Sequence, residues 1–340
     1  MMRKPEKETI ENIKIYKTDV PPIINPNLIP AFIMENQSNS EQIQTFYADN
    51  PYLRVSIFEG ISQKLLIISK NIYGNHVIRK ILQFKEKDKI DQIFSKLEDN
   101  IKELAIDDYG TFVIQELIQK VNQVQLKKIS NMLVNCTDFK EFIKNKNVRK
   151  VIEELIERQD KNDNDEICKK ILTDFVPFCN NEFTSFIIEK LLINCNETYY
   201  KKMKKECLNN LSKLNTNKNG AHIICSFIQK HIEEFFEPIK NDAFKLSQTQ
   251  FGVLVIKELI KYGNQNQNNL IIEEIVKAKN ENSKNNLLFL SQHQYGNFVI
   301  QNIFKFLDEN TKMSLKNDLE SIIKKRDNIY ANHVWENIQK

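Results

Sequence analysis

Residues 293–304 read HQYGNFVIQNIF, and residues 71–82 read NIYGNHVIRKIL. Aligning the chain on these two stretches reveals six further copies: DDYGTFVIQELI (107–118), NKNVRKVIEELI (145–156), NEFTSFIIEKLL (181–192), NKNGAHIICSFI (217–228), TQFGVLVIKELI (249–260) and NIYANHVWENIQ (328–339). The aligned Val or Ile falls at 77, 113, 151, 187, 223, 255, 299 and 334, at intervals of 36, 38, 36, 36, 32, 44 and 35 residues. A nearly constant period indicates stacked repeats, here called the first to eighth copies in chain order.

Each copy has the pattern of a helix that begins at a turn. Seven copies open with a residue whose side chain can accept hydrogen bonds from the first free amides of a helix: Asn71, Asp107, Asn145, Asn181, Asn217, Thr249 and Asn328. Apolar residues recur at offsets 0, 1, 4 and 5 from the aligned Val or Ile, which places them in one buried stripe. A second helical pattern lies ahead of the second copy, in residues 89–100. The sequence therefore predicts an all-α fold, an α-solenoid of about eight stacked helical repeats.

Three positions of each copy lie off the buried stripe. They are positions −2, −1 and +2, counted from the aligned Val or Ile. The residues at −2 and +2 are four apart, so they are neighbours on the helix surface. We expect each copy to present its three side chains together on an exposed edge.

Composition excludes several classes of protein. Seven glycines and eight prolines among 340 residues argue against glycine-rich β folds and dinucleotide-binding loops. The six cysteines lack metal-ligand spacing, and no catalytic motif is present, so we expect no enzyme, metal site or cofactor. With 49 basic and 45 acidic residues, any nucleic-acid site must be local. The start of the chain lacks an apolar leader, and no apolar stretch could span a bilayer, so a cytoplasmic protein without a membrane segment is expected.

Two kinds of segment fall outside the copies. Residues 1–50 hold five of the eight prolines and no repeat match, which predicts an extended or partly disordered N-terminal arm. Residues 51–340 are expected to form the repeat domain. Within it, polar residues near 157–166 and 262–286 predict solvated inserts.

The copies resemble the Pumilio (PUF) RNA-binding repeats over roughly residues 60–340, most clearly in YGNHVIRKIL and YGNFVIQNIF. The resemblance implies a curved superhelix in which each repeat meets one RNA base, with residues −2 and +2 at the base edge and residue −1 stacked on the base. The implied edge pairs are Asn75 with Arg79, Thr111 with Gln115, Arg149 with Glu153, Ser185 with Glu189, Asn297 with Gln301, and Asn332 with Glu336. The implied stacking residues are His76, Phe112, Lys150, Phe186, His222, Phe298 and His333.

Base preferences follow from the resemblance for only two copies. Asn297 with Gln301 looks like a uracil-reading pair, and Ser185 with Glu189 looks like a guanine-reading pair. The fifth and sixth copies depart from the family pattern at Ala221, Val253 and Leu254, and Arg149 with Glu153 could form an ion pair of their own. Relaxed sequence specificity is therefore expected.

The resemblance implies a monomeric single-stranded RNA-binding protein that takes part in post-transcriptional regulation of mRNA. The alternative is a ribosome-associated or ribosome-biogenesis protein that binds rRNA or protein surfaces as a scaffold, in which case a nucleolar location is implied. In either case the segment 1–50 is a candidate site for a ribosomal or regulatory protein partner.

Overall fold

The computed structural model describes residues 25–278, 285–325 and 328–339. Every regular element in these ranges is helical, which confirms the all-α prediction. The chain divides after Asp163 into two compact units, and each is described by itself.

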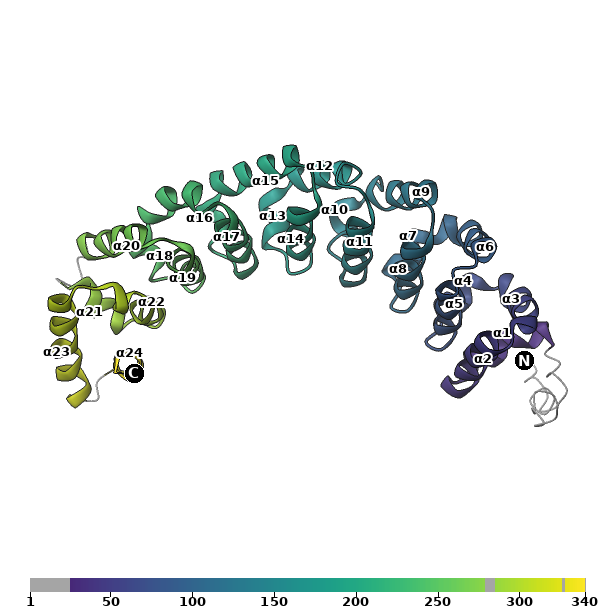
Figure 1. Cartoon of the computed structure of the whole chain (residues 1–340), viewed down its shortest axis with the longest axis horizontal. Coiled ribbons are helices and arrows are strands. Elements are labelled where there is room, and N and C mark those ends of the chain that lie inside the picture. The colour runs from purple at the N-terminus through teal and green to yellow at the C-terminus, as the bar shows by residue number, and fades with distance from the viewer. Residues whose placement is uncertain (1–24, 279–284, 326–327, 340) are drawn as a thin grey trace, which may run out of the picture. The chain divides into compact units, whose positions relative to one another are not determined.

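The first unit contains the first three copies, and each copy forms one long helix of its repeat (Figure 1). These helices, α5, α8 and α11, lie side by side, and each follows a short helix. The elements of this unit are η3 (Pro26–Leu28), α1 (Ile29–Glu35), α2 (Gln37–Asp49), η4 (Pro51–Leu53), α3 (Arg54–Ser62), α4 (Leu65–Ser69), α5 (Gly74–Gln83), α6 (Lys87–Leu97), η5 (Glu98–Asn100), α7 (Ile101–Ile106), α8 (Gly110–Lys120), α9 (Gln123–Val134), α10 (Phe139–Phe142) and α11 (Lys146–Arg158).

The second unit repeats this arrangement with the fourth to eighth copies in α14, α17, α19, α22 and α24. Helix α17 runs through a kink at His231, whose backbone is not helical. The elements of this unit are α12 (Asp165–Thr173), α13 (Phe175–Asn180), α14 (Thr184–Asn194), α15 (Glu197–Asn209), α16 (Leu211–Leu214), α17 (Lys218–Lys240), α18 (Ala243–Leu246), α19 (Gly252–Tyr262), α20 (Gln265–Lys277), α21 (Asn286–Ser291), α22 (Gly296–Ile303), η6 (Phe304–Phe306), α23 (Glu309–Lys325) and α24 (Ile329–Ile338).

The repeated glycine allows two helices of one repeat to approach closely. A Cβ on Gly74 would lie 2.9 Å from the carbonyl oxygen of Ile68, six residues earlier. The same close contact with the carbonyl six residues earlier occurs at Gly110, Gly220, Gly252 and Gly296. None of these glycines has a positive φ, so close packing rather than backbone freedom requires them. The fourth copy has Thr184 here, and its hydroxyl donates a hydrogen bond to the equivalent carbonyl of Phe178.

The N-terminal segment differs from the sequence-based expectation. The extended arm predicted for residues 1–50 is wrong over residues 26–49, which form η3, α1 and α2. These helices form because their apolar residues pack inside the unit, where Ile33, Ile43 and Tyr47 are fully buried. Residues 1–24 lie outside the described part of the chain.

The polar inserts are also shorter than predicted. Around residues 157–166, α11 continues to Arg158 and α12 begins at Asp165. Around residues 262–286, the Asn-rich run begins α20 instead of forming a loop. Asn264 and Gln267 close a capping box, in which each side chain accepts the other's backbone N–H at 2.9 Å. Residues 279–284 lie outside the described ranges.

Candidate nucleic-acid interface

Each copy begins at a turn whose first side chain accepts hydrogen bonds from the backbone. In the first copy, Asn71 Oδ1 accepts from the N–H groups of Tyr73 at 2.9 Å and Gly74 at 2.8 Å. The same role is confirmed for the other predicted capping residues: Asp107, Asn145, Asn181, Asn217, Thr249 and Asn328. These bonds satisfy amides that a helix start would otherwise leave without partners.

The seventh copy uses a histidine for this purpose, which the sequence reasoning missed. His293 Nδ1 accepts from the N–H groups of Tyr295 and Gly296, both at 3.2 Å. An imidazole nitrogen accepts only when it carries no proton, so this cap requires neutral His293. Burial lowers the pKa of His293, which favours that neutral form. The sequence did contain a signal for this cap, because His293 aligns with the Asn, Asp or Thr that caps the helix in each of the other seven copies.

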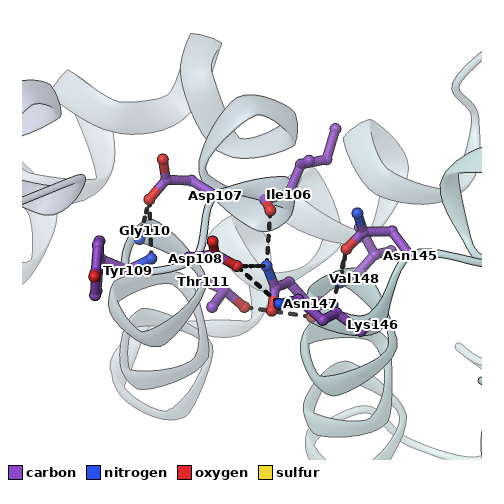
Figure 2. A network of polar contacts seen from close by, with 10 residues as sticks. All are labelled: Ile106, Asp107, Asp108, Tyr109, Gly110, Thr111, Asn145, Lys146, Asn147 and Val148. Atoms are coloured by element: carbon purple, nitrogen blue, oxygen red, sulfur yellow. Dashed lines mark hydrogen bonds and ion pairs between the residues drawn. The ribbon is translucent and has the colours of Figure 1, made fainter. Parts of the chain in front are cut away.

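Polar contacts also join the turns of adjacent copies, as Figure 2 shows for the second and third. Asn147 Nδ2 donates to the carbonyl oxygen of Ile106 at 2.9 Å and to Asp108 Oδ1 at 3.0 Å. In return, Thr111 Oγ1 donates to the carbonyl oxygen of Asn147 at 3.3 Å, and Lys146 lies 3.2 Å from Asp108. The copies are thus held in a fixed stacking register by bonds to each other's backbone.

Residue −1 is the exposed member of the triplet. It is exposed in seven copies, at His76, Phe112, Lys150, Phe186, His222, Phe298 and His333. The three phenylalanines keep 36%, 47% and 46% of their surface accessible. Large apolar side chains at one repeated surface position are typical of a binding surface. In the sixth copy the residue is Leu254, which is half-buried.

Residue −2 lies deeper than predicted. The expectation that it occupies an exposed edge is wrong for six copies, where it is buried: Asn75, Thr111, Ser185, Ala221, Val253 and Asn297. The cause is the turns around this position, because its side chain bonds to backbone carbonyls of its own copy or of the next one. Asn75 Nδ2, for example, donates to the carbonyl oxygens of Asn71 and Ile72 within its own turn. Residue −2 therefore supports the turn. Residue +2 beside it is at least partly exposed in seven copies and buried in the fifth, where it is Cys225.

In two copies residue −2 holds residue +2 by a hydrogen bond. Gln301 Nε2 donates to Asn297 Oδ1 at 3.1 Å, and Asn297 Nδ2 in turn donates to two carbonyls of its turn. Gln115 Nε2 donates to Thr111 Oγ1 at 3.2 Å in the same way. Each bond fixes the amide of the glutamine while leaving its Oε1 acceptor available to a base edge.

Two cations lie against Phe112 from the copies on either side. The guanidinium of Arg79 is 5.4 Å from the ring centroid, and Lys150 Nζ is 5.8 Å from it. These are distances at which a cation is attracted to a ring face. Residues at −1 and +2 of successive copies thus form one continuous surface over α5, α8 and α11.

The third copy has its edge residues paired with each other. Arg149 Nε lies 3.4 Å from Glu153 Oε1, and both side chains are mostly covered. The ion pair that the sequence suggested is present. A base at this copy must compete with it for both partners.

The fourth copy has a carboxylate at +2. Burial raises the pKa of Glu189, and the nearby His222 and Ser226 oppose that effect. Ser185 beside it is buried. A carboxylate held here can accept hydrogen bonds from a base when it is ionised.

The fifth, sixth and eighth copies differ in their edge residues. Ala221 and Cys225 are both buried in the fifth copy, and Val253 is buried in the sixth. In the eighth copy Asn332 Oδ1 is buried with no partner among the described residues, whereas His333 and Glu336 are exposed. The structure thus keeps the turn in every copy but not the polar pair.

No helix in the described ranges is long and apolar enough to cross a membrane.

A family model described as the Pumilio-family RNA binding repeat matches residues 64–98, 100–134, 242–276 and 286–317. Each matched segment begins with or just before the short helix of one repeat and includes a complete copy. The chain belongs to the Pumilio (PUF) family. The PUF copies that the model does not match include the third and fourth, in which Val148 and Thr184 replace the repeated glycine.

Relatives of this PUF chain are distant. Pumilio homolog 11 from Arabidopsis thaliana is 22% identical over 277 residues, which cover 78% of this chain and 47% of the relative. Pumilio homolog 12 from the same plant is 21% identical over 280 residues, covering 80% of this chain and 39% of the relative. This chain therefore spans less than half the length of these two relatives.

Solved PUF structures share the fold. The crystal structure of PUF-8 in complex with PBE-RNA superposes with a TM-score of 0.79 at 17% identity, covering 93% of this chain and 94% of that one. The Puf3 RNA binding domain bound to a Cox17 RNA 3′ UTR recognition sequence gives 0.78 at 19% identity, covering 94% and 97%. The helical repeat solenoid predicted from the sequence is confirmed.

Proposed function

We propose that this PUF protein binds single-stranded RNA along positions −1 and +2 of its copies, one base to a copy, with relaxed sequence specificity. The observation that carries the proposal is that six copies combine an exposed residue −1 with a residue +2 that is at least partly exposed. Rings at −1 supply stacking surfaces, each worth about 1–3 kcal/mol per base. Membership of the family and the RNA-bound state of similar solved structures support the same reading.

The proposed base preferences follow from the two polar pairs. If the RNA runs antiparallel to the copies, the eighth copy meets the 5′ base, the seventh meets the second base and the fourth meets the fifth. Gln301, held by Asn297, then favours uracil at the second base. Glu189 favours guanine at the fifth base, because a carboxylate accepts from its N1–H and N2–H. At the other RNA positions we expect little preference among the four bases. Arg149 and Glu153 pair with each other, and the fifth and sixth copies have apolar Ala221 and Val253.

Selection from a randomised RNA pool tests this proposal. We expect enrichment of uracil and guanine three nucleotides apart, and a pool that enriches neither base contradicts the preferences. Phe298→Ala and Gln301→Ala should weaken binding to RNA with uracil at the second position, the former by about fivefold or more from lost stacking. Met313→Ala and Asn310→Ala, exposed residues on α23, are matched controls that should leave affinity unchanged.

The role we propose is regulation of mRNA after transcription in the cytoplasm, by a monomer. The second candidate is a scaffold on ribosomal RNA or ribosomal protein surfaces, with a nucleolar location. Its support is that the fifth and sixth copies have apolar residues, Ala221 and Val253, at position −2, where the other copies have polar ones. If filter binding shows no RNA affinity above that of a basic control protein, the scaffold function is favoured. A partner of the N-terminal segment belongs to either proposal.

A further inference from the structure

Residues 36–47 read NQSNSEQIQTFY and begin 35 residues before the first copy, the spacing of one repeat. They form the start and body of α2, which packs beside α5. Asn36 caps α2, because its Oδ1 accepts from the N–H of Asn39 at 2.9 Å, just as Asn71 accepts from Gly74 three residues on. Asn36 therefore stands where Asn71 stands, and Ser40 stands at position −2.

The contact between α2 and the next copy fixes the same register. Ser40 Oγ donates to the carbonyl oxygen of Tyr73 at 2.8 Å. Thr111 Oγ1 makes the matching bond to the carbonyl oxygen of Asn147 at 3.3 Å. Tyr73 and Asn147 are each the third residue of their copies. Helix α2 thus stacks on the first copy as the second copy stacks on the third.

The exposed side of α2 repeats the pattern of the copies. Ser40 is buried, Glu41 is exposed and Gln44 is half-buried, in the order found for Thr111, Phe112 and Gln115. Gln44 Nε2 donates to Ser40 Oγ at 3.2 Å, the same distance that joins Gln115 to Thr111. That bond uses one N–H of the amide, and its second N–H and Oε1 can meet the edge of a base.

We propose that Ser40, Glu41 and Gln44 form a ninth nucleotide-binding position, located one repeat before the first copy. The inference rests on the proposed RNA binding and on antiparallel polarity, which places the extra nucleotide at the 3′ end of the bound RNA. Gln44 contacts the base edge, and Ser40 holds Gln44 in place.

Glu41 makes this position weaker than its neighbours. Its carboxylate accepts from Gln37 Nε2 at 2.8 Å and lies close enough to His76, the next residue −1, to raise the pKa of that imidazole, although burial and Arg79 lower it by more. A carboxylate offers no ring for stacking and repels the RNA phosphates. The ninth position therefore reads a base edge without a stacking partner of its own.

Two RNAs that differ by one nucleotide test the inference. The first is an eight-nucleotide RNA selected on the full chain, and the second carries one more 3′ nucleotide, supplied as each of the four bases. We expect at least one longer RNA to bind about threefold more tightly, whereas the same addition at the 5′ end does not. Gln44→Ala should abolish this gain, and Thr45→Ala, an exposed position of the same helix, should keep it.

Glu41→Tyr provides a gain of binding that misfolding cannot imitate. A ring at this position should raise affinity for the longer RNA by about tenfold and leave the eight-nucleotide RNA nearly unchanged. The inference is overturned if the eight-nucleotide RNA binds but the 3′ extension and both substitutions have no effect. If neither RNA binds, the proposed function itself has failed.

Discussion

The sixth and seventh copies, in α19 and α22, lie side by side (Figure 1). They share the same turn but differ in the side chains that follow it. In both, a glycine packs against a leucine carbonyl six residues earlier, and a side chain caps the helix. Their residues at −2, −1 and +2 are Val253, Leu254 and Lys257 in the sixth copy and Asn297, Phe298 and Gln301 in the seventh, of which Val253 and Asn297 are buried.

The difference shows that the turn and the surface depend on separate residues. Gly252 and Gly296 are needed because two backbones approach closely, whichever side chains follow them. The residues at −1 and +2 of these two copies are exposed or half-buried and carry little of the packing. A copy can therefore lose its polar pair and remain a sound part of the solenoid.

The largest expected effect comes from filling the shared close contact. At Gly296, an added Cβ would lie 2.7 Å from Leu290 Cδ2 and 2.9 Å from the Leu290 carbonyl oxygen. Gly296→Ala and Gly252→Ala should each lower the free energy of unfolding by about 1–3 kcal/mol, typical of overpacking. Urea unfolding measures this loss. A neutral substitution at either glycine would show that the close approach is not what requires it.

The next largest effect comes from giving the sixth copy the residues −2, −1 and +2 of the seventh copy. The triple substitution Val253→Asn, Leu254→Phe and Lys257→Gln should raise affinity for RNA with uracil at the third position by about tenfold, through one stacked base and its edge contacts. Fluorescence anisotropy with the four bases at that position measures it. The control is the same set of RNAs varied at the fourth position, where no new preference should appear.

A smaller effect concerns the capping residues, Thr249 in the sixth copy and His293 in the seventh, because only the histidine titrates near neutral pH. Because burial lowers the pKa of His293 in the folded chain, the unfolded chain binds its proton first as the pH falls below about 6.5. Stability from this cap is therefore present above about pH 6.5 and is lost as the pH falls toward the folded pKa. His293→Asn should remove this dependence, which amounts to at most about 1 kcal/mol, the size of a helix cap.

Urea unfolding at pH 7.5 and at pH 5.5 tests the histidine. Thr249→Asn in the sixth copy is the control, since neither threonine nor asparagine titrates there. An equal loss of stability on acidification in wild type and His293→Asn would mean that other groups carry the dependence.

The smallest expected effect on stability is at the third copy. Arg149→Ser breaks a partly covered ion pair between residues four apart on one helix, which should lower the free energy of unfolding by about 0.5 kcal/mol or less. It also leaves Glu153 beside a serine, the arrangement of Ser185 and Glu189. We expect RNA selection with this variant to gain guanine at the sixth base, and an unchanged preference would show that the ion pair is not what silences this copy.

The sequence predicted the repeats well because their cause is local. Capping residues, the glycine and the apolar stripe each have a fixed place within twelve residues, so the alignment finds them. Residue −1 was correctly expected at the surface for the same reason. The burial of residue −2 was missed, because it depends on contacts with the turns of its own and the next copy, which helix periodicity does not describe.

The N-terminal helices were missed because their signals are weaker. Residues 36–47 have Asn39 in place of the glycine and Gln42 in place of the aligned Val or Ile, so alignment on glycines passes over them. Five prolines nearby also suggested an extended chain, although Pro26 is the first residue of η3 and Pro30 the second of α1, in the first turn, where proline is well tolerated. The cap at Asn36 was the remaining signal.

The unequal intervals between copies bear on how such a chain tolerates insertions and deletions. Only 32 residues separate the aligned positions 223 and 255, whereas 44 separate 255 and 299. Even so, α17 contacts α19 and α19 contacts α22 as direct neighbours. The two intervals differ by 12 residues, yet each joins two helices that pack as neighbours. Residues can therefore be gained or lost between copies while the helices that carry positions −1 and +2 stay next to one another.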